Sequence, residues 1–331
     1  MKKIMFISLS LLLIAAVAFS GCLNSGDKET TDVVIGYQPS THQMAYTSAK
    51  ELGWWSDNLT KMDEVTKVSD KSFPSGPSEA TSLASNAIQV AYIGAAPLIP
   101  AVAQNNADLK IIAAVQINGS GLVIPTNATY TDPTYFEGKK IATFPPGSIQ
   151  DTLLKQWLTD NGVDLSKVEI KGMDSGEAQT SLKAGSVDAV FLPHPAPSII
   201  VKAGDGKVIM DSGEMSPDHA CCVLAVSQKF IDEHPDVVAE IVKIHVDATK
   251  YTNENPETAA KYYANVTGVS EDIILSSINE WDGAWVSDPH LIEEYVVAYA
   301  KSQYEQGLVP RQLTSEELFD MSFYDAYVNK K

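Results

Sequence analysis

Three short turns carry the residues best suited to binding a ligand. Ser75-Gly76-Pro77-Ser78 combines a turn, a helix-capping serine and a proline at the start of a helix. Gly94-Ala95 and Gly147-Ser148 begin helices in the same way. Free backbone N–H groups and positive dipole ends at such helix starts favour anions. None of these turns contains a charged side chain, so binding would use backbone and hydroxyl groups. The alternative is that they are ordinary connections between strands and helices.

The two cysteines that follow Cys22 in the chain are neighbours, Cys221 and Cys222. A disulfide between neighbours is strained, so no disulfide framework is expected. We interpret both as buried, small apolar side chains, with a reactive or ligand-facing thiol as the alternative. His194 is a structural residue between two prolines, a partly charged anion contact, or a neutral donor whose role depends on pH. A metal held by His194, His219 and the cysteine pair is a further alternative. The spacing is not that of a zinc site, so we predict no metal.

The N-terminus indicates an exported protein. Lys2-Lys3 precedes an apolar stretch over residues 4–19, and Ser20-Gly21 lies directly before Cys22. This pattern is typical of a secretory signal and resembles the lipobox of bacterial and archaeal lipoproteins. We expect a signal peptide over residues 1–21, lipidation of Cys22 and anchoring to the outer face of the cytoplasmic membrane. An uncleaved membrane anchor is the alternative.

The composition excludes several classes of function. The 331 residues carry a formal net charge of −18, which argues against nucleic acid or an anionic membrane surface as a partner. Arg311 is the only arginine in the chain, so an arginine clamp on an anion is not expected elsewhere. The chain contains no phosphate-binding loop, no nucleophile elbow and no zinc-protease motif, and we predict that it is not an enzyme.

Strands that alternate with helices predict βαβ units and mainly parallel sheets. One series of strands ends near Gln116, a second series restarts at Leu122, and only helices are expected from Ser227 onward. Ligands bind at the carboxyl ends of the strands in open sheets of this kind. We therefore expect the helices after Ser75-Gly76 and Gly94 to start at the ends of adjacent strands.

The chain resembles the substrate-binding proteins of ABC importers of the nitrate, sulfonate, taurine and bicarbonate type, from Val33 to about Gln306. Each shared motif is short, but their order and spacing are specific. The motifs are Ile35-Gly36-Tyr37, Ala49-Lys50-Glu51-Leu52-Gly53-Trp54-Trp55, Ser75-Gly76-Pro77-Ser78, Val90-Ala91-Tyr92-Ile93-Gly94-Ala95-Ala96-Pro97, Glu137-Gly138-Lys139-Lys140-Ile141-Ala142, Pro146-Gly147-Ser148, Leu182-Lys183-Ala184-Gly185-Ser186-Val187-Asp188-Ala189-Val190 and Phe230-Ile231-Asp232-Glu233-His234-Pro235-Asp236.

The resemblance implies a two-lobed α/β protein of the type II periplasmic-binding fold, with a helical C-terminal extension. After a lipidated tether over residues 22–32, lobe one would comprise residues 33–120 and 224–331, and lobe two residues 121–223. The lobes would close on a small ligand by hinge motion. The resemblance also implies a monomer without a cofactor that docks on an ABC permease with its ATPase.

By the same resemblance, the ligand site is the cleft between the lobes. The residues expected there are Gln38, Ser40, Ser75, Gly76, Ser78, Gly94, Ala95, Asn118, Ser120, Gly147, Ser148, Gln150 and His194. The family often has an aromatic residue in the loop where this chain has Pro193-His194-Pro195. Three helix starts that converge on one cleft can hold a sulfonate-like or nitrate-like oxyanion without a full positive charge.

Three other functions are open. A heterocyclic vitamin precursor, similar to the thiamine pyrimidine, could stack on Trp54, Trp55, Trp281 or Trp285. A surface sensor or metal-binding lipoprotein would use the histidines and cysteines. An enzyme similar to the yeast-type thiamine pyrimidine synthases is the weakest alternative, because two cysteines do not make that family's motif.

Overall fold

The structure is a computed structural model that describes residues 29–105 and 107–330. The expected signal peptide and Cys22 lie outside the described residues. Strand β1 begins at Thr31, within the segment that was expected to be a tether. No helix in the described part of the chain combines the length and apolar character needed to cross a membrane.

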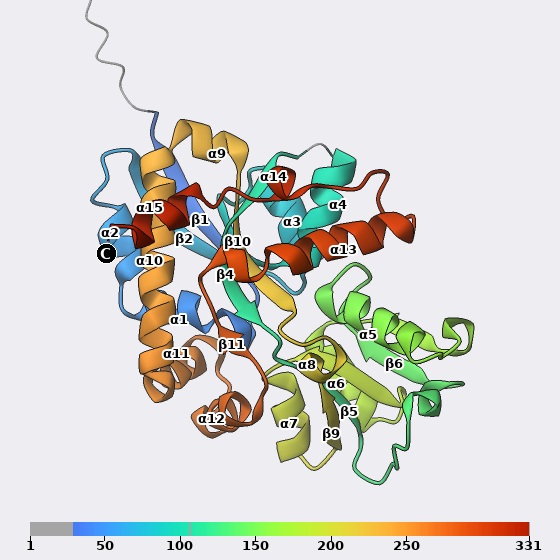
Figure 1. Ribbon diagram of the computed structural model, residues 1–331. Coiled ribbons are helices and arrows are strands. Elements are labelled where there is room, and N and C mark those ends of the chain that lie inside the picture. Colours follow the sequence, from blue (N-terminus) through green and yellow to red (C-terminus); the bar gives the residue numbers. More distant parts are fainter. Residues whose placement is uncertain (1–28, 106, 331) are drawn as a thin grey trace, which may run out of the picture.

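Two sheets form the centres of two lobes (Figure 1). The first sheet has the strand order β11-β4-β10-β3-β1-β2. Its strands are β1 (Thr31–Tyr37), β2 (Val65–Ser72), β3 (Val90–Gly94), β4 (Leu109–Ile117), β10 (Ala220–Ser227) and β11 (Ala284–Trp285). The second sheet has the order β7-β6-β8-β5-β9, with strands β5 (Ser120–Pro125), β6 (Lys140–Thr143), β7 (Glu169–Gly172), β8 (Ala189–Pro193) and β9 (Gly206–Asp211).

Helices cover both faces of the sheets, and the C-terminal helices extend lobe one (Figure 1). The α-helices are α1 (Met44–Glu51), α2 (Trp54–Leu59), α3 (Gly76–Ala84), α4 (Ala95–Asn105), α5 (Ile149–Asp160), α6 (Ser175–Lys183), α7 (Ala196–Lys202), α8 (Ser212–Met215), α9 (Gln228–Glu233), α10 (Pro235–Glu254), α11 (Pro256–Thr267), α12 (Glu271–Glu280), α13 (Glu293–Glu305), α14 (Ser315–Leu318) and α15 (Ser322–Val328). A short 3-10 helix, Thr41–Gln43, follows β1.

One strand in each sheet is responsible for most of the antiparallel pairing. β10 runs antiparallel to both β3 and β4, and β5 runs antiparallel to both β8 and β9. The strands β1 to β4 therefore share one direction, as do β6 to β9. The two antiparallel strands, β5 and β10, each directly follow a segment that crosses between the lobes. The first crossing leads from β4 into β5, and the second leads from β9 through α8 into β10. The two-lobed α/β architecture agrees with the sequence prediction. Most strands of each sheet share one direction, but five of the nine strand pairings in the described residues are antiparallel.

Three details differ from the sequence expectations. β2 and β3 do not pair with each other, because β1 lies between them, so the helices α3 and α4 start at the ends of strands that flank β1. A short strand, β11, occurs after Ser227, where only helices were expected. Ser120 already belongs to the second sheet, and Ala220–Ser227 pairs in the first sheet. The chain therefore passes between the two sheets at residues 118–119 and again at residues 212–219.

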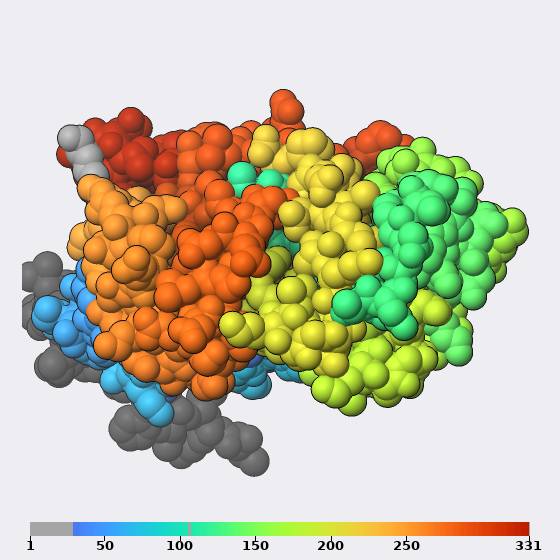
Figure 2. Space-filling model, turned by 90° about the horizontal axis from the view of Figure 1, so that it is seen from below, coloured from blue at the N-terminus to red at the C-terminus, as the bar shows by residue number. Residues whose placement is uncertain are grey.

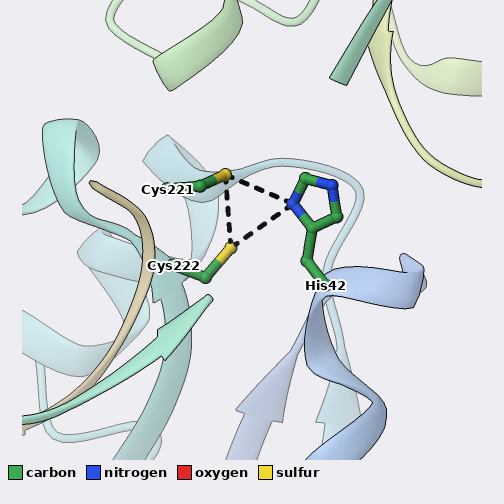
Figure 3. Close-up of side chains that lie close together, drawn as sticks. All are labelled: His42, Cys221 and Cys222. Carbon is green, nitrogen blue, oxygen red and sulfur yellow. Dashed lines mark hydrogen bonds between the residues drawn. The ribbon is translucent and has the colours of Figure 1, made fainter. Parts of the chain in front are cut away.

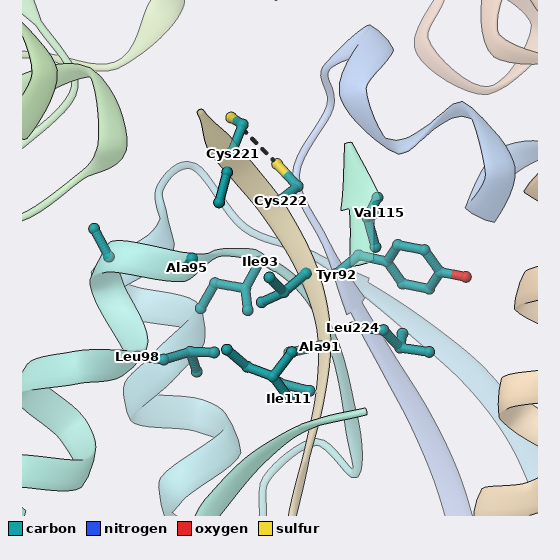
Figure 4. Close-up of a cluster of buried hydrophobic side chains, with 14 of the residues drawn as sticks. Ala91, Tyr92, Ile93, Ala95, Leu98, Ile111, Val115, Cys221, Cys222 and Leu224 are labelled. Atoms are coloured by element: carbon teal, nitrogen blue, oxygen red, sulfur yellow. Dashed lines mark hydrogen bonds between the residues drawn. The ribbon is translucent and has the colours of Figure 1, made fainter. Parts of the chain in front are cut away.

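The two lobes are in extensive contact. Figure 2 shows the C-terminal helical region (orange) directly against the chain that runs through α7 and α8 (yellow), and α12 packs on α7. The core of lobe one lies between β3, β10 and the neighbouring helices, where Ala91, Ile93, Leu98, Ile111 and Leu224 are buried together (Figure 4). Cys221 and Cys222 lie at the end of this cluster (Figure 4).

Asp282 fixes both crossing segments between the lobes. One carboxylate oxygen accepts the Gly119 N–H at 2.8 Å, and the other accepts the Gly213 N–H at 2.5 Å. Gly119 has φ +84°, and a side chain there would also collide with Gln116 and His42. The first crossing and the start of the second are therefore tied to one side chain from the C-terminal extension.

Replacing Asp282 with alanine is expected to lower the free energy of unfolding by roughly 2–4 kcal/mol. Hydrogen bonds to charged groups contribute about 1.5–3 kcal/mol each, and Asp282 is half-buried. Urea unfolding followed by tryptophan fluorescence measures the change. Asp288→Ala is the matched control, because Asp288 accepts the N–H of the exposed His290 and contacts neither crossing segment. Equal losses in the two variants would contradict the assigned role of Asp282.

His245 is a neutral histidine in the core of lobe one. Its Nε2–H donates to the Ala114 carbonyl at 2.6 Å, and its Nδ1 lies 2.9 Å from the Tyr92 hydroxyl. Burial lowers the pKa of His245 to about 4. The unfolded chain takes up this proton below about pH 6.5, whereas the folded protein takes it up only near pH 4.

Acid should therefore destabilise the protein partly through His245. Between pH 6.5 and 4, this residue alone makes stability fall by roughly 1.4 kcal/mol per pH unit as the pH decreases. Melting temperatures measured across that range should fall less steeply for His245→Gln than for the unmodified protein. Parallel pH profiles for the two proteins would show that His245 is charged when folded.

Candidate functional site

A cavity between the two lobes lies at the carboxyl ends of β1, β3 and β8. Its internal volume is about 20 Å³, which is room for about one water molecule. The lining residues are Gln38, Ser40, His42, Gln43, Gly76, Gly94, Pro97, Cys221 and Cys222 on the lobe-one side, and Phe144, Ser148, Ile149, Gln150 and Pro193 on the other. The lobes are thus closed around a small space in this structure.

Six of the residues expected at the site line this cavity. They are Gln38, Ser40, Gly76, Gly94, Ser148 and Gln150. Because these residues belong to the starts of α3, α4 and α5 or to the loop after β1, three helix N-termini meet at one space. Ser148 is the N-cap of α5, and its hydroxyl accepts the Asp151 N–H.

The other seven expected residues do not line the cavity. Ser75 and Ala95 are buried beside lining glycines, whereas Ser78 is exposed and donates to the Ser75 carbonyl. Gly147 donates its N–H to Asp151. Asn118 and Ser120 lie at the crossing, where Ser120 Oγ accepts a hydrogen bond from Gln150 Nε2 at 3.0 Å.

His194, the last of these seven, is buried behind the cavity. Its Nδ1 lies 2.9 Å from Ser277 Oγ, and its Nε2 has no hydrogen-bond partner among the described residues. Burial, followed by the nearby His42, lowers the pKa of His194 to about 3. This histidine is therefore neutral at physiological pH, and the partly charged anion contact considered from the sequence does not fit its position.

Eight lining residues were not among those expected at the site, although a ligand-facing role of Cys221 and Cys222 was an alternative from the sequence. The eight are His42, Gln43, Pro97, Phe144, Ile149, Pro193, Cys221 and Cys222. For His42 and Gln43 a signal existed, since both follow the first strand on the same loop as Gln38 and Ser40. None of the tryptophans considered for stacking on a heterocycle is among the lining residues.

Amide side chains form the polar part of the cavity wall and are held in place. Gln43 Nε2 donates to the Tyr92 carbonyl at 2.6 Å, and Gln43 Oε1 accepts the Gln38 N–H at 2.7 Å. The Gln38 side chain donates to Glu79 Oε2 at 2.9 Å. No lysine or arginine is among the described residues that line the cavity, so no cationic side chain contributes to its polar character.

Glu79 in the first turn of α3 is a fully buried carboxyl group next to this wall. Its Oε1 has no hydrogen-bond partner among the described residues. Burial raises the pKa of Glu79 well above its usual value, against the opposing effect of the Gln38 hydrogen bond. A protonated Glu79 places no negative charge beside the cavity, which suits an anionic ligand.

His42 and the cysteine pair form a compact group on the cavity wall (Figure 3). Nδ1 of His42 lies 3.2 Å from Cys221 Sγ and 3.9 Å from Cys222 Sγ, and the two sulfurs are 3.7 Å apart. Both thiols are free. A hydrogen bond from Cys221 lowers the pKa of Cys222, against the opposing effect of burial. The Cys221–Cys222 contact and burial raise the pKa of Cys221.

Comparison with known proteins identifies the family. The sequence matches the NMT1-like family over residues 26–267, and the chain belongs to that family. It is 27% identical over 276 residues to the putative aliphatic sulfonates-binding protein of Bacillus subtilis, covering 83% of this chain and 81% of the relative. It is also 27% identical over 276 residues to the taurine-binding periplasmic protein of Escherichia coli, covering 82% and 79%.

Solved structures share the fold. The alkanesulfonate-binding protein SsuA of Xanthomonas axonopodis, bound to MOPS, superposes with a TM-score of 0.76 at 19% identity, over 88% of this chain and 99% of that one. The nitrate-binding protein NrtA of Synechocystis has a TM-score of 0.76 at 16% identity, over 91% and 89%. The fold is therefore that of periplasmic binding proteins, as expected. The relatives are named as binding proteins, which supports the expectation that this chain is not an enzyme.

Replacing Glu79 with glutamine is expected to stabilise the protein increasingly as the pH rises. Below about pH 4.5, Glu79 is protonated in both the folded and the unfolded chain. At higher pH the unfolded chain releases this proton while the folded protein keeps it, because the folded pKa is raised. The stability of the unmodified protein therefore falls as the pH rises towards the folded pKa. The glutamine side chain keeps the shape without the proton. Melting temperatures from pH 5 to pH 8 test this expectation.

Glu177→Gln is the matched control for Glu79→Gln. Glu177 occupies the first turn of α6, as Glu79 does in α3, but it is exposed. The control should show no gain that grows with pH. If Glu79→Gln behaves like this control, Glu79 is ionised in the folded protein.

Proposed function

We propose that this protein is the substrate-binding component of an ABC importer and captures a small oxyanion in the cavity between its lobes. The ligand class is that of sulfonates, taurine, nitrate and bicarbonate. The loaded, closed form would dock on a permease that is driven by an ATPase. The N-terminal pattern around Cys22 supports lipidation and a tether to the outer face of the cytoplasmic membrane. The family resemblance implies a monomer.

The main support is the position of the cavity at three helix N-termini. Gly76, Gly94 and Ser148 line it, and each lies at the start of a helix of at least nine residues. Backbone N–H groups and helix dipoles at such starts stabilise an anion without a cationic side chain. The amides of Gln38, Gln43 and Gln150 add further hydrogen-bonding groups.

The relatives narrow the ligand class. Relatives that align over most of this chain carry names that refer to aliphatic sulfonates and taurine. The bicarbonate-binding protein CmpA of Synechococcus elongatus is 26% identical, but only over 118 residues, which is 35% of this chain. The small volume of the closed cavity favours a ligand of few atoms over a bulky sulfonate.

Small oxyanions should raise the melting temperature. Taurine, methanesulfonate, nitrate and bicarbonate are tested one by one, with chloride at equal ionic strength as the reference. A ligand that binds only the folded state at 100 times its Kd stabilises it by about 2.7 kcal/mol, which corresponds to roughly 5 °C. No shift with any of the four anions would overturn the oxyanion assignment.

Gly94→Ala tests whether the binding anion occupies this cavity. An added methyl group at Gly94 would lie 3.3 Å from Ile149 Cγ1 across the cleft and 3.3 Å from Pro97 Cδ. Because this crowding opposes closure, we expect affinity for the active anion to fall roughly tenfold or more, measured by calorimetry. Ser78→Ala, at an exposed position outside the cavity, should bind normally. Unchanged affinity in Gly94→Ala would place the anion elsewhere.

A further inference from the structure

We propose that His42, Cys221 and Cys222 bind one thiophilic metal ion, such as Zn²⁺ or Cu⁺, on the lobe-one wall of the cavity. Nδ1 of His42 and the two cysteine sulfurs are the ligands. A fourth coordination position is open towards the cavity. The idea that an anion in the cavity occupies this open position rests on the proposed function. The metal site itself does not.

The donor atoms already have the spacing that a tetrahedral metal requires. With metal–sulfur bonds of about 2.3 Å and metal–nitrogen bonds of about 2.0–2.1 Å, two sulfurs lie about 3.8 Å apart, and nitrogen and sulfur about 3.5 Å apart. Here the sulfurs are 3.7 Å apart, and the nitrogen lies 3.2 Å and 3.9 Å from them. All three side chains are buried, and their donor atoms lie within 4.8 Å of one another (Figure 3).

The tautomer of His42 is set for metal binding. Its Nε2 lies 2.6 Å from the Gly119 carbonyl oxygen, which can only accept a hydrogen bond, so Nε2 carries the proton. In the neutral ring, Nδ1 then presents its lone pair to the two sulfurs. A backbone carbonyl that fixes the second nitrogen in this way is the usual outer-shell partner of a metal-binding histidine.

A β-bulge brings both cysteines to the same side of β10. Neighbouring residues in a regular strand point to opposite faces, which would separate the two sulfurs. In the pairing of β10 with β4, Ala220 is opposite Ile117 and Cys222 is opposite Gln116, so Cys221 is an extra residue. Bulges of this kind redirect side chains next to functional sites. The bulge is an observation independent of the sulfur–nitrogen distances, and a pair of buried apolar side chains does not require it.

The charge balance also favours a cation. No lysine or arginine is among the described residues that line the cavity, so no cationic side chain there opposes the binding of a metal ion. Zn²⁺ with two thiolates and a neutral imidazole forms a neutral unit. Three protein ligands with one open position are typical of zinc sites that bind an exogenous group. An oxyanion in the cavity could fill that position and gain an electrostatic contact that the cavity's side chains do not offer.

Co²⁺ is the probe for the test because its spectrum reports its ligands. The full chain carrying Cys22→Ser, purified in detergent, reduced and stripped with a chelator, has Cys221 and Cys222 as its remaining thiols. We expect one equivalent of Co²⁺ to produce thiolate-to-cobalt charge-transfer bands and the intense visible bands of a tetrahedral site. One equivalent of Zn²⁺ should remove them. Absence of the charge-transfer bands would overturn the proposal, whatever the variants do.

Single substitutions identify the ligands. Cys221→Ser, Cys222→Ser and His42→Gln should each lower the affinity for Co²⁺ by more than the roughly 10–100-fold that is typical for loss of an outer-shell partner. His219→Gln is the matched control, because His219 is also buried near β10 but lies outside the group of three. Binding that survives in His42→Gln, or that is lost equally in His219→Gln, would contradict the three-ligand site.

Anions test the open position separately. Nitrate or methanesulfonate added to the Co²⁺ form should change the visible bands if the anion completes the coordination. An anion that raises the melting temperature but leaves those bands unchanged would overturn the open position while the metal site stands. If no anion acts in either experiment but Co²⁺ binds, the proposed oxyanion function fails and the metal site is retained.

Discussion

The antiparallel insertion of β10 between β3 and β4 is the constraint on which the rest of the structure depends. This strand returns the chain from the second lobe, and its pairing on both sides fixes how the lobes meet. The same strand carries Cys221 and Cys222 to the cavity. Because Cys222 lies opposite Gly94, at the end of β3 from which α4 starts, the cysteine pair and one of the helix N-termini are held in register.

Gly119 links the crossing between the lobes to the cavity. Its N–H is bound by Asp282 and its carbonyl by His42, so one residue joins the C-terminal extension, the first crossing and the cavity wall. Since Gly119 adopts φ +84° in a crowded position, no other residue would fit without displacing these neighbours. The orientation of His42 is therefore tied to the conformation of the first crossing.

Much of the fold could be predicted from the sequence because local patterns determine it. The alternation of strands and helices, the helix starts at Gly76, Gly94 and Ser148, and the family resemblance led to two α/β lobes and to six of the lining residues. The order of strands in the sheet was less accessible. Nothing in the local sequence shows that β1 lies between β2 and β3, and β11, with two residues, is too short to have a pattern.

The group of His42, Cys221 and Cys222 could not be predicted, for two physical reasons. His42 is 179 residues from Cys221, so only the completed fold brings them together. The common orientation of the two cysteines depends on a bulge, whereas the sequence alternation of a strand predicts opposite faces. The histidines that the sequence offers as alternative metal ligands, His194 and His219, are buried outside this group.

The burial of the two thiols has a consequence for the lifetime of the protein. Cys221 is 2% exposed and Cys222 5% exposed while the lobes are closed. Outside the cytoplasm, unpaired thiols are subject to irreversible oxidation once oxidants reach them, and among the described residues each of these thiols has only the adjacent cysteine as a possible disulfide partner. The rate of oxidative inactivation would then follow the fraction of time that the lobes spend apart. The protein would therefore be inactivated faster without its ligand than with the ligand bound.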